Sequence, residues 1–263
     1  MSFVQHLRIG RQFARMGVAR KTQFRVEFVS QIVMDTVWYA THVSVFEMLM
    51  LHTQSLAGWS LPELRVFLSF LFVSDALWMA WMGKSWHFGR DLKDGNLDPI
   101  RVRPASPIFL YFFQSFSLEA CVNGAIAAGY LVWALHSAGI LAEPRTWLIL
   151  PWAIALCWWA RVVVTVLFSI AEFYLVNSDL GMFAYELFLG PIERPLDVFG
   201  RRVKQFLLLV VPVGVLTHFP AAMVLGRIGP LEAAAHSAWL VLLGLGVFRA
   251  WRASFRRYES ALS

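Results

Sequence analysis

The chain has 263 residues, of which 58% are hydrophobic and only 15% are charged, and its formal net charge is +6. Soluble domains carry about 25% charged residues, so the composition excludes an ordinary soluble protein and favours an all-α, multi-pass membrane protein. The basic residues lie beside long apolar runs, so membrane topology explains the positive charge and no nucleic-acid partner is expected.

Residues 1–25 are predicted to form an amphipathic helix on the membrane surface. Arginine and lysine alternate in this segment with apolar side chains such as Leu7, Phe13 and Met16. A basic helix with an apolar face lies in the plane of the membrane interface, in contact with the lipid bilayer. The alternative is a disordered basic tail.

Six apolar runs follow, each long enough for a helix of about 20 residues that crosses a bilayer. They cover residues 26–51, 61–82, 107–135, 147–175, 206–225 and 231–248. Pro212 and Pro220 fall inside the fifth run, and each proline removes a backbone donor and clashes with the preceding turn. We therefore expect that helix to be broken and packed against protein, because broken backbone is not tolerated in lipid.

The positions of the basic residues orient these six spans. Placing both termini in the cytoplasm also places residues 83–106 and 177–204 there, and with them most of the 23 lysine and arginine residues. The exceptions are Arg65, Arg145, Arg161 and Arg227. Because basic residues are enriched in cytoplasmic loops, the sequence predicts six spans with both termini cytoplasmic.

Residues 83–106 form the longest strongly charged segment between two apolar runs. Their polar, turn-rich composition cannot lie in lipid, so we expect an aqueous loop. Its basic charge favours the cytoplasmic side, which makes this loop the expected contact for a cytoplasmic partner.

Four charged residues deep in the predicted spans are candidates for a translocation path: Asp35, Asp75, Glu119 and Arg161. A charge in the middle of a bilayer costs about 2.5–3.5 kcal/mol on insertion scales and therefore usually faces protein or a wet cavity. Arg161 needs a carboxylate partner, for which the other three residues are candidates. The alternative is a structural ion pair with no part in transport.

The sequence contains none of several common catalytic motifs. There is no Gly-x-x-x-x-Gly-Lys-Ser/Thr phosphate loop, no His-Glu-x-x-His and no Gly-x-Ser-x-Gly, and the seven histidines are scattered singly. We therefore expect a protein that is not an enzyme and that binds no nucleotide, metal or cofactor directly.

The central loop resembles the signature of one family. Two adjacent stretches are similar to its "G-x-L-D … L-x-R-P-x-S" pattern: Gly95-Asn96-Leu97-Asp98 and Arg101-Val102-Arg103-Pro104-Ala105-Ser106-Pro107. The family comprises six-span permeases of type 2 ATP-binding-cassette exporters, including daunorubicin-type and uncharacterised permeases. Val102 and Ala105 depart from its usual residues.

Three further stretches resemble the same family: Val211-Pro212-Val213, Phe219-Pro220-Ala221 and Arg257-Tyr258-Glu259-Ser260. The resemblance thus extends over nearly the whole chain, although the loop motif is its most specific part.

The resemblance implies a partner and a mechanism. Such a permease pairs with an identical or related second permease, and the pair sits on two copies of a cytoplasmic ATPase that holds ATP and Mg²⁺. Residues 86–94 would form a coupling helix that docks in a groove of the ATPase, and residues 95–104 a rigid turn into the third span. The residues implicated in ATPase coupling are Trp86, Phe88, Arg90, Leu92, Asp94, Gly95, Asp98, Arg103 and Pro104.

The expected function is therefore that of a permease in a bacterial cytoplasmic membrane. Its expected substrate is hydrophobic or amphipathic, such as a drug-like compound, a lipid or a glycan. An ion- or proton-coupled secondary transporter is the main alternative and would use the four intramembrane charges as a relay. An intramembrane enzyme and a membrane scaffold without transport activity are two further alternatives.

Overall fold

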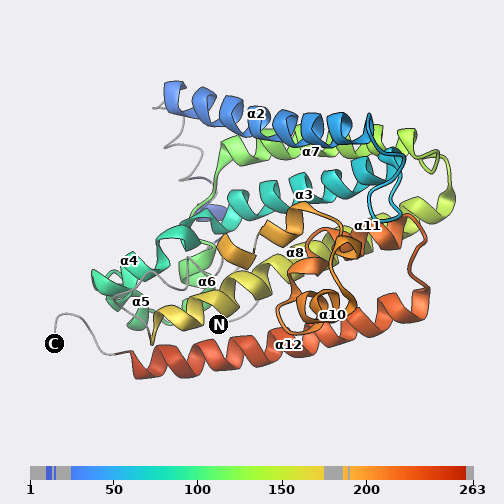
Figure 1. Ribbon diagram of the computed structural model, residues 1–263. Helices are drawn as coiled ribbons and strands as arrows, with labels where there is room; N and C mark the ends of the chain where they lie inside the picture. The colour runs from blue at the N-terminus through green and yellow to red at the C-terminus, as the bar shows by residue number, and fades with distance from the viewer. Residues whose placement is uncertain (1–9, 14, 16–24, 175–185, 189, 259–263) are drawn as a thin grey trace.

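The apolar runs form helices, and the computed structural model describes residues 10–13, 15, 25–174, 186–188 and 190–258. No β-strand occurs among these residues, in agreement with the all-helical prediction. The long helices lie side by side in an elongated bundle (Figure 1). The amphipathic helix predicted for residues 1–25 falls mostly outside the described residues.

The bundle has two distinct ends. The short helices α4 (Phe88–Lys93) and α5 (Asp98–Arg101) lie at one end, after the 3₁₀ turn η1 (Gly83–His87) (Figure 1). The loop that joins α2 (Arg25–Met50) to α3 (Leu61–Met82) lies at the other end (Figure 1). We call these the α4–α5 end and the α2–α3 loop end.

Four helices among the described residues are long and apolar enough to cross a membrane. They are α3 with its continuation to Lys93, α7 (Leu118–Ser137), α8 (Pro144–Glu172) and α12 (Pro230–Arg257). The bent pair of Arg201–Leu209 and Pro212–Val224 makes a fifth if it counts as one span. α2 is long enough at 26 residues but is not among the four, so six spans remain a prediction.

The third predicted span, residues 107–135, is interrupted near its start. α6 (Pro107–Phe112) ends before α7 begins at Leu118. Ser117 stabilises the break, because its hydroxyl accepts a hydrogen bond from the amide of Ala120 at 3.1 Å and caps α7. The amide of Ser117 donates to the carbonyl of Ala80 at 3.0 Å, which fixes the break against α3.

The fifth predicted span is broken, as its prolines indicate. α10 (Arg201–Leu209) meets the segment of η4 (Pro212–Val215) and α11 (His218–Val224) at an angle of 74°. Every residue of α11 is buried. The expectation that this broken backbone packs against protein is therefore confirmed.

Residues 190–204 do not form part of a loop at the α4–α5 end, so that part of the topology prediction is wrong. The indole of Trp59, beside the start of α3, donates to the carboxylate of Asp197 at 2.7 Å. Ile192 in η2 (Gly190–Glu193) and Leu196 in η3 (Leu196–Val198) are buried, so this mixed sequence packs inward. Its basic residues therefore cannot be counted with those of α4 and α5.

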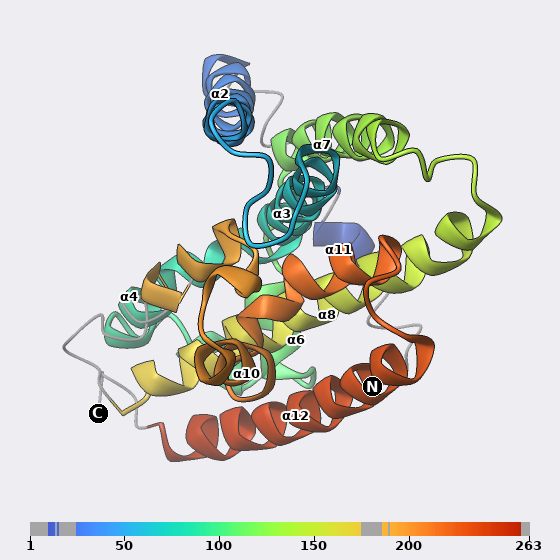
Figure 2. The ribbon, with the colours of Figure 1, turned by 45° about the vertical axis from the view of Figure 1, so that its right-hand side comes forward.

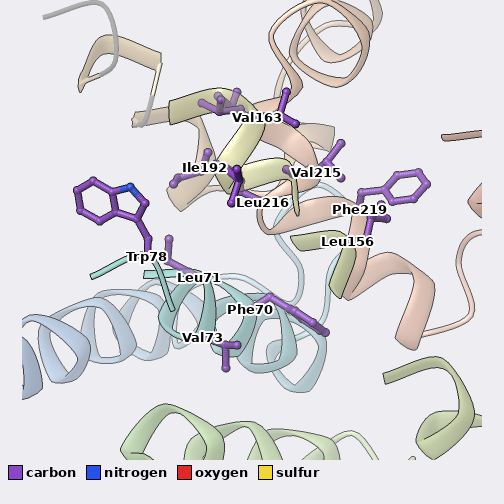
Figure 3. Packing of buried hydrophobic residues seen from close by; sticks show 14 of the residues in the cluster. Phe70, Leu71, Val73, Trp78, Leu156, Val163, Ile192, Val215, Leu216 and Phe219 are labelled. Carbon is purple, nitrogen blue, oxygen red and sulfur yellow. The ribbon is translucent and has the colours of Figure 1, made fainter. Parts of the chain in front are cut away.

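The hydrophobic core lies between α3, α8 and the broken fifth span. This span consists of α10, η4 and α11, and we call it the broken segment. Figure 3 shows its central side chains: Phe70, Leu71, Val73, Trp78, Leu156, Val163, Ile192, Val215, Leu216 and Phe219. Segments far apart in the sequence thus share one core, which fixes the broken backbone beside two continuous helices.

The close packing of α12 on α8 can be tested at Gly244. A Cβ atom at Gly244 would lie 2.7 Å from the ring of Trp159 and 3.0 Å from Val163, whereas one at Gly246 would meet nothing within 4 Å. We expect Gly244→Val to destabilise the protein by about 1–3 kcal/mol through overpacking, and Gly246→Val to have a much smaller effect. Thermal unfolding in detergent, followed by tryptophan fluorescence, measures both; equal effects would contradict this packing.

Candidate functional site

The segment from η1 to α5 presents one face to the outside. Its exposed residues are Trp86, His87, Arg90, Asp94, Asn96, Pro99, Arg101, Val102, Arg103 and Pro104. We call this set the outer face of α4–α5. It combines charged side chains with two exposed apolar ones, since Trp86 is 36% and Val102 85% exposed. Such a mixture of arginine, aromatic and apolar groups is typical of a surface that binds another protein.

The opposite face of the same segment is buried within the chain. Phe88 and Leu92 are only 2% and 1% exposed. Both side chains therefore face the bundle and not the outside, and their predicted part in ATPase coupling stays a prediction. Residues three or four apart share a helix face, so the positions between the exposed Trp86, Arg90 and Asp94 turn inward.

Phe88 occupies an aromatic cluster formed by the ends of three helices. Its ring centroid lies 5.0 Å from that of Tyr111 and 5.8 Å from that of Phe112, which belong to α6. It lies 5.3 Å from Phe173, at the end of α8, and 6.3 Å from Trp251 of α12. Aromatic pairs at these separations add about 0.5–1.5 kcal/mol each beyond their burial, so this cluster anchors α4 to the bundle.

Asp91 adds a polar anchor that the sequence analysis missed. Its carboxylate accepts hydrogen bonds from the hydroxyl of Tyr111 at 2.8 Å and from the amide of Asn96 at 3.0 Å. The ammonium of Lys84 lies 3.4 Å from the same carboxylate. Nothing in the sequence distinguishes Asp91 from the exposed Asp94, because only the folded chain determines which of them faces Tyr111.

Two glycines allow this segment to lie close to the bundle. A Cβ atom at Gly89 would lie 2.8 Å from the carboxylate of Glu172 at the end of α8, so α4 approaches α8 through a bare backbone. Gly95 has a φ of 70°, a conformation that other residues rarely adopt, and it turns the chain from α4 toward α5.

The predicted turn residues beyond Gly95 have different environments. Asp98 is half-buried, and its amide donates to the carbonyl of Gly95 at 3.0 Å. Arg103 and Pro104 are exposed and belong to the outer face of α4–α5.

Two of the four intramembrane charges form an ion pair. A guanidinium nitrogen of Arg161 in α8 lies 3.7 Å from the carboxylate of Asp75 in α3. The guanidinium also lies over the ring of Trp78, 4.8 Å from its centroid. Of the three candidate partners for Arg161, the structure therefore selects Asp75.

Asp35 and Glu119 take other positions. α2 lies at the edge of the bundle against α3 and α7 (Figure 2), and Asp35 accepts hydrogen bonds from Gln31 and from Asn123 of α7. Glu119 is buried in the first turn of α7. The imidazole of His42 in α2 lies 3.6 Å from the carboxylate of Glu193 in η2. The contacts of Asp35 and His42 thus connect α2 to α7 and to η2.

A separate apolar pocket of about 730 Å³ lies between α3, the end of α6 and α8. It is lined by Leu77, Trp81, Phe113, Trp147, Leu150, Pro151, Ile154, Ala155 and Trp158. Its volume is within the range of about 300–1,000 Å³ that is usual for small-molecule sites. Among the described residues, no group of three or more His, Cys, Asp or Glu could hold a metal ion.

A family model described as "ABC-2 family transporter protein" matches residues 36–261. The chain belongs to this family. It is thus the permease of an ATP-binding-cassette transporter, a multi-pass membrane component that is not itself catalytic. The match includes α4, α5 and all of α12, and it agrees with the resemblance noted in the central loop. Comparisons with curated proteins and with solved structures gave no match.

At the α2–α3 loop end of the permease, Arg227 fastens the connection between α11 and α12 to the start of α3. Arg227 donates to the carboxylate of Glu63 at 3.0 Å and to the carbonyl of Gly58 at 2.7 Å. Its guanidinium lies over the ring of Trp59, 4.4 Å from the centroid, and Trp59 in turn donates to Asp197. This end therefore joins the start of α3 to η3 and to the connection between α11 and α12.

The ion pair of Asp75 and Arg161 can be tested with a double variant. We expect Arg161→Leu to destabilise the permease by about 2 kcal/mol, less than the 3–5 kcal/mol typical of a fully buried pair because the Asp75 side chain is 30% exposed. Arg161→Leu combined with Asp75→Asn is expected to recover part of that loss. Thermal unfolding in detergent measures both, and a double variant no more stable than the single one would contradict the pairing.

Asp197 gives the permease an acid-dependent contact. Burial raises the pKa of Asp197. Hydrogen bonds from Lys204 and Trp59, together with nearby positive charge, lower it by a larger amount, so the pKa of Asp197 is below its ordinary value. A carboxyl with a lowered pKa stabilises the folded state above its unfolded pKa and loses that contribution as the pH falls through its folded pKa.

We therefore expect Asp197→Asn to reduce the unfolding temperature at pH 7 and to reduce it less near pH 3, which is below the ordinary aspartate pKa of about 3.9, measured by scanning fluorimetry. Glu143→Gln, at an exposed position, serves as the control. An effect of Asp197→Asn that is the same at both pH values would count against the contact.

Proposed function

We propose that the permease moves a hydrophobic or amphipathic substrate across a bacterial cytoplasmic membrane, driven by ATP that a separate cytoplasmic ATPase hydrolyses. The observation that carries this proposal is the two-sided α4–α5 segment. Its outer face is exposed and rich in charge, while its inner face is anchored to α6, α8 and α12. A partner that pushes on the outer face therefore pushes on the spanning helices.

The chemistry of the outer face supports a protein partner at the cytoplasmic surface. Arg90, Arg101 and Arg103 supply planar donors that suit carboxylates of a partner, and Trp86 supplies an apolar contact. ATP and Mg²⁺ would be held by the ATPase and not by the permease. In this arrangement the end of α12 is cytoplasmic, because it lies at the α4–α5 end (Figure 1), and we propose the cytoplasmic side for the N-terminus as well.

We propose the assembly that the resemblance implies, in which two permeases, identical or related, stand on two ATPase copies. The apolar pocket beside Pro151 supports the proposed substrate class, because hydrophobic and aromatic side chains make up its whole lining.

A charge reversal on the outer face tests the partnership. We expect Arg90→Glu to reduce co-purification of the ATPase from native membranes at least tenfold, because a charged contact at an interface is replaced by repulsion. Arg202→Glu is the matched control, since Arg202 is exposed on α10, away from α4. Pull-down in mild detergent with mass spectrometry measures the ATPase recovered for each permease.

Equal recovery of the ATPase with both variants would show that Arg90 is not part of the interface. Recovery of the wild-type permease without any ATPase in several detergents would contradict the proposed function. In that case proton-driven transport by the reconstituted permease alone becomes the next measurement, because it would support the secondary transporter.

A further inference from the structure

The end of α12 reaches back to α4 through one tyrosine. The hydroxyl of Tyr258, which directly follows the last helical residue of α12, donates a hydrogen bond to the backbone carbonyl of Leu92 at 3.1 Å. The two residues are 166 positions apart in the sequence. This bond therefore joins the last spanning helix to the proposed coupling helix.

The carbonyl of Leu92 is available because α4 ends there. Carbonyls in the last turn of a helix lack donors from a following turn. The amides of Asp94 and Gly95 also approach this oxygen, that of Gly95 at the long distance of 3.4 Å. The carbonyl has two lone pairs, so it can accept the stronger bond from the tyrosine as well. The bond fixes the backbone of α4 and does not depend on the side chain of Leu92.

The ring of Tyr258 holds its hydroxyl in place. Its centroid lies 6.4 Å from those of Phe255 in α12 and Phe173 at the end of α8. The guanidinium of Arg101 lies 5.8 Å from the ring centroid, so α5 also contacts the tyrosine. Tyr258 thus touches α4, α5, α8 and α12 where these elements meet.

A second contact joins α4 to α12, between Phe88 and Trp251. One point of contact lets a short helix pivot, whereas two points restrain its orientation as well. Trp251 is fully buried and Tyr258 is half-buried, so the second point lies closer to the surface than the first. Loss of the tyrosine bond would leave α4 anchored to the bundle by Phe88 and Asp91, but with the contact of Phe88 and Trp251 as its remaining described link to α12.

We propose that Tyr258 is a positioning residue that makes α12 follow α4 when the ATPase moves α4. This inference rests on the proposed function. It adds that the displacement passes to α12 through the hydroxyl of Tyr258, and not only through the aromatic cluster around Phe88. Without that hydroxyl, α4 still moves with the ATPase and α12 moves less, while both helices stay packed in the bundle.

Hydrogen–deuterium exchange of the permease–ATPase complex, with and without ATP and vanadate, tests this proposal without a known substrate. Exchange reports local opening of helices, so peptides from α4 and α12 report separately on the two elements. In the wild-type complex, ATP is expected to change exchange in both. In Tyr258→Phe, the change in α4 is retained and the change in α12 falls about fivefold, which corresponds to a loss of about 1 kcal/mol for one neutral hydrogen bond.

Tyr174→Phe is the matched control. The hydroxyl of Tyr174 lies 3.1 Å from that of Ser254, so it joins the region after α8 to α12 but does not contact α4 through this bond. The control is expected to respond to ATP as the wild type does. Co-purification of the ATPase and the unfolding temperature are measured for every variant, so that assembly and folding are known.

An ATP-induced change in α12 that is equal in Tyr258→Phe and wild type would overturn the proposal, as would a loss of folding or assembly in Tyr258→Phe. A wild-type complex in which α4 responds and α12 does not would also overturn it. A wild-type permease that binds no ATPase would instead overturn the proposed function, and the absence of ATPase in the wild-type sample identifies that failure.

Discussion

The burial of Phe88 and Asp91 beneath the ends of α6, α8 and α12 is the contact on which the α4–α5 end depends. A helix of six residues is not stable alone, because nucleation costs more than so few hydrogen bonds return. The position of α4 is therefore set by tertiary contacts. The same contacts join the outer face of α4–α5 to the three helices that hold the segment. This connection is the basis of the proposed coupling.

Sequence patterns located the long helices and the break at Pro212, because apolar length and proline chemistry act locally. They also limited the partner of Arg161 to three carboxylates, of which the fold selects Asp75. They failed for short segments. Which side of α4 faces inward, why the chain breaks before Leu118, and where residues 190–204 lie all depend on tertiary partners that no local pattern encodes.

The intramembrane charges connect neighbouring helices. Asp75 faces Arg161 across α3 and α8, and Asp35 of α2 accepts hydrogen bonds from Gln31 and from Asn123 of α7. None of the four predicted charges lines the apolar pocket beside Pro151. The pocket and the ion pair therefore lie in different parts of the bundle.

Photo-crosslinking from the outer face of α4–α5 is the most direct test of whether this face binds a cytoplasmic ATPase. A benzoyl-phenylalanine at Val102, which is 85% exposed, would report what lies against α5 in the native membrane, and one at Val203, 47% exposed on α10, is the comparison. We predict a crosslink to a cytoplasmic ATPase from position 102 and none from position 203. Crosslinks from position 102 to lipid alone, or to the ATPase from both positions, would contradict it.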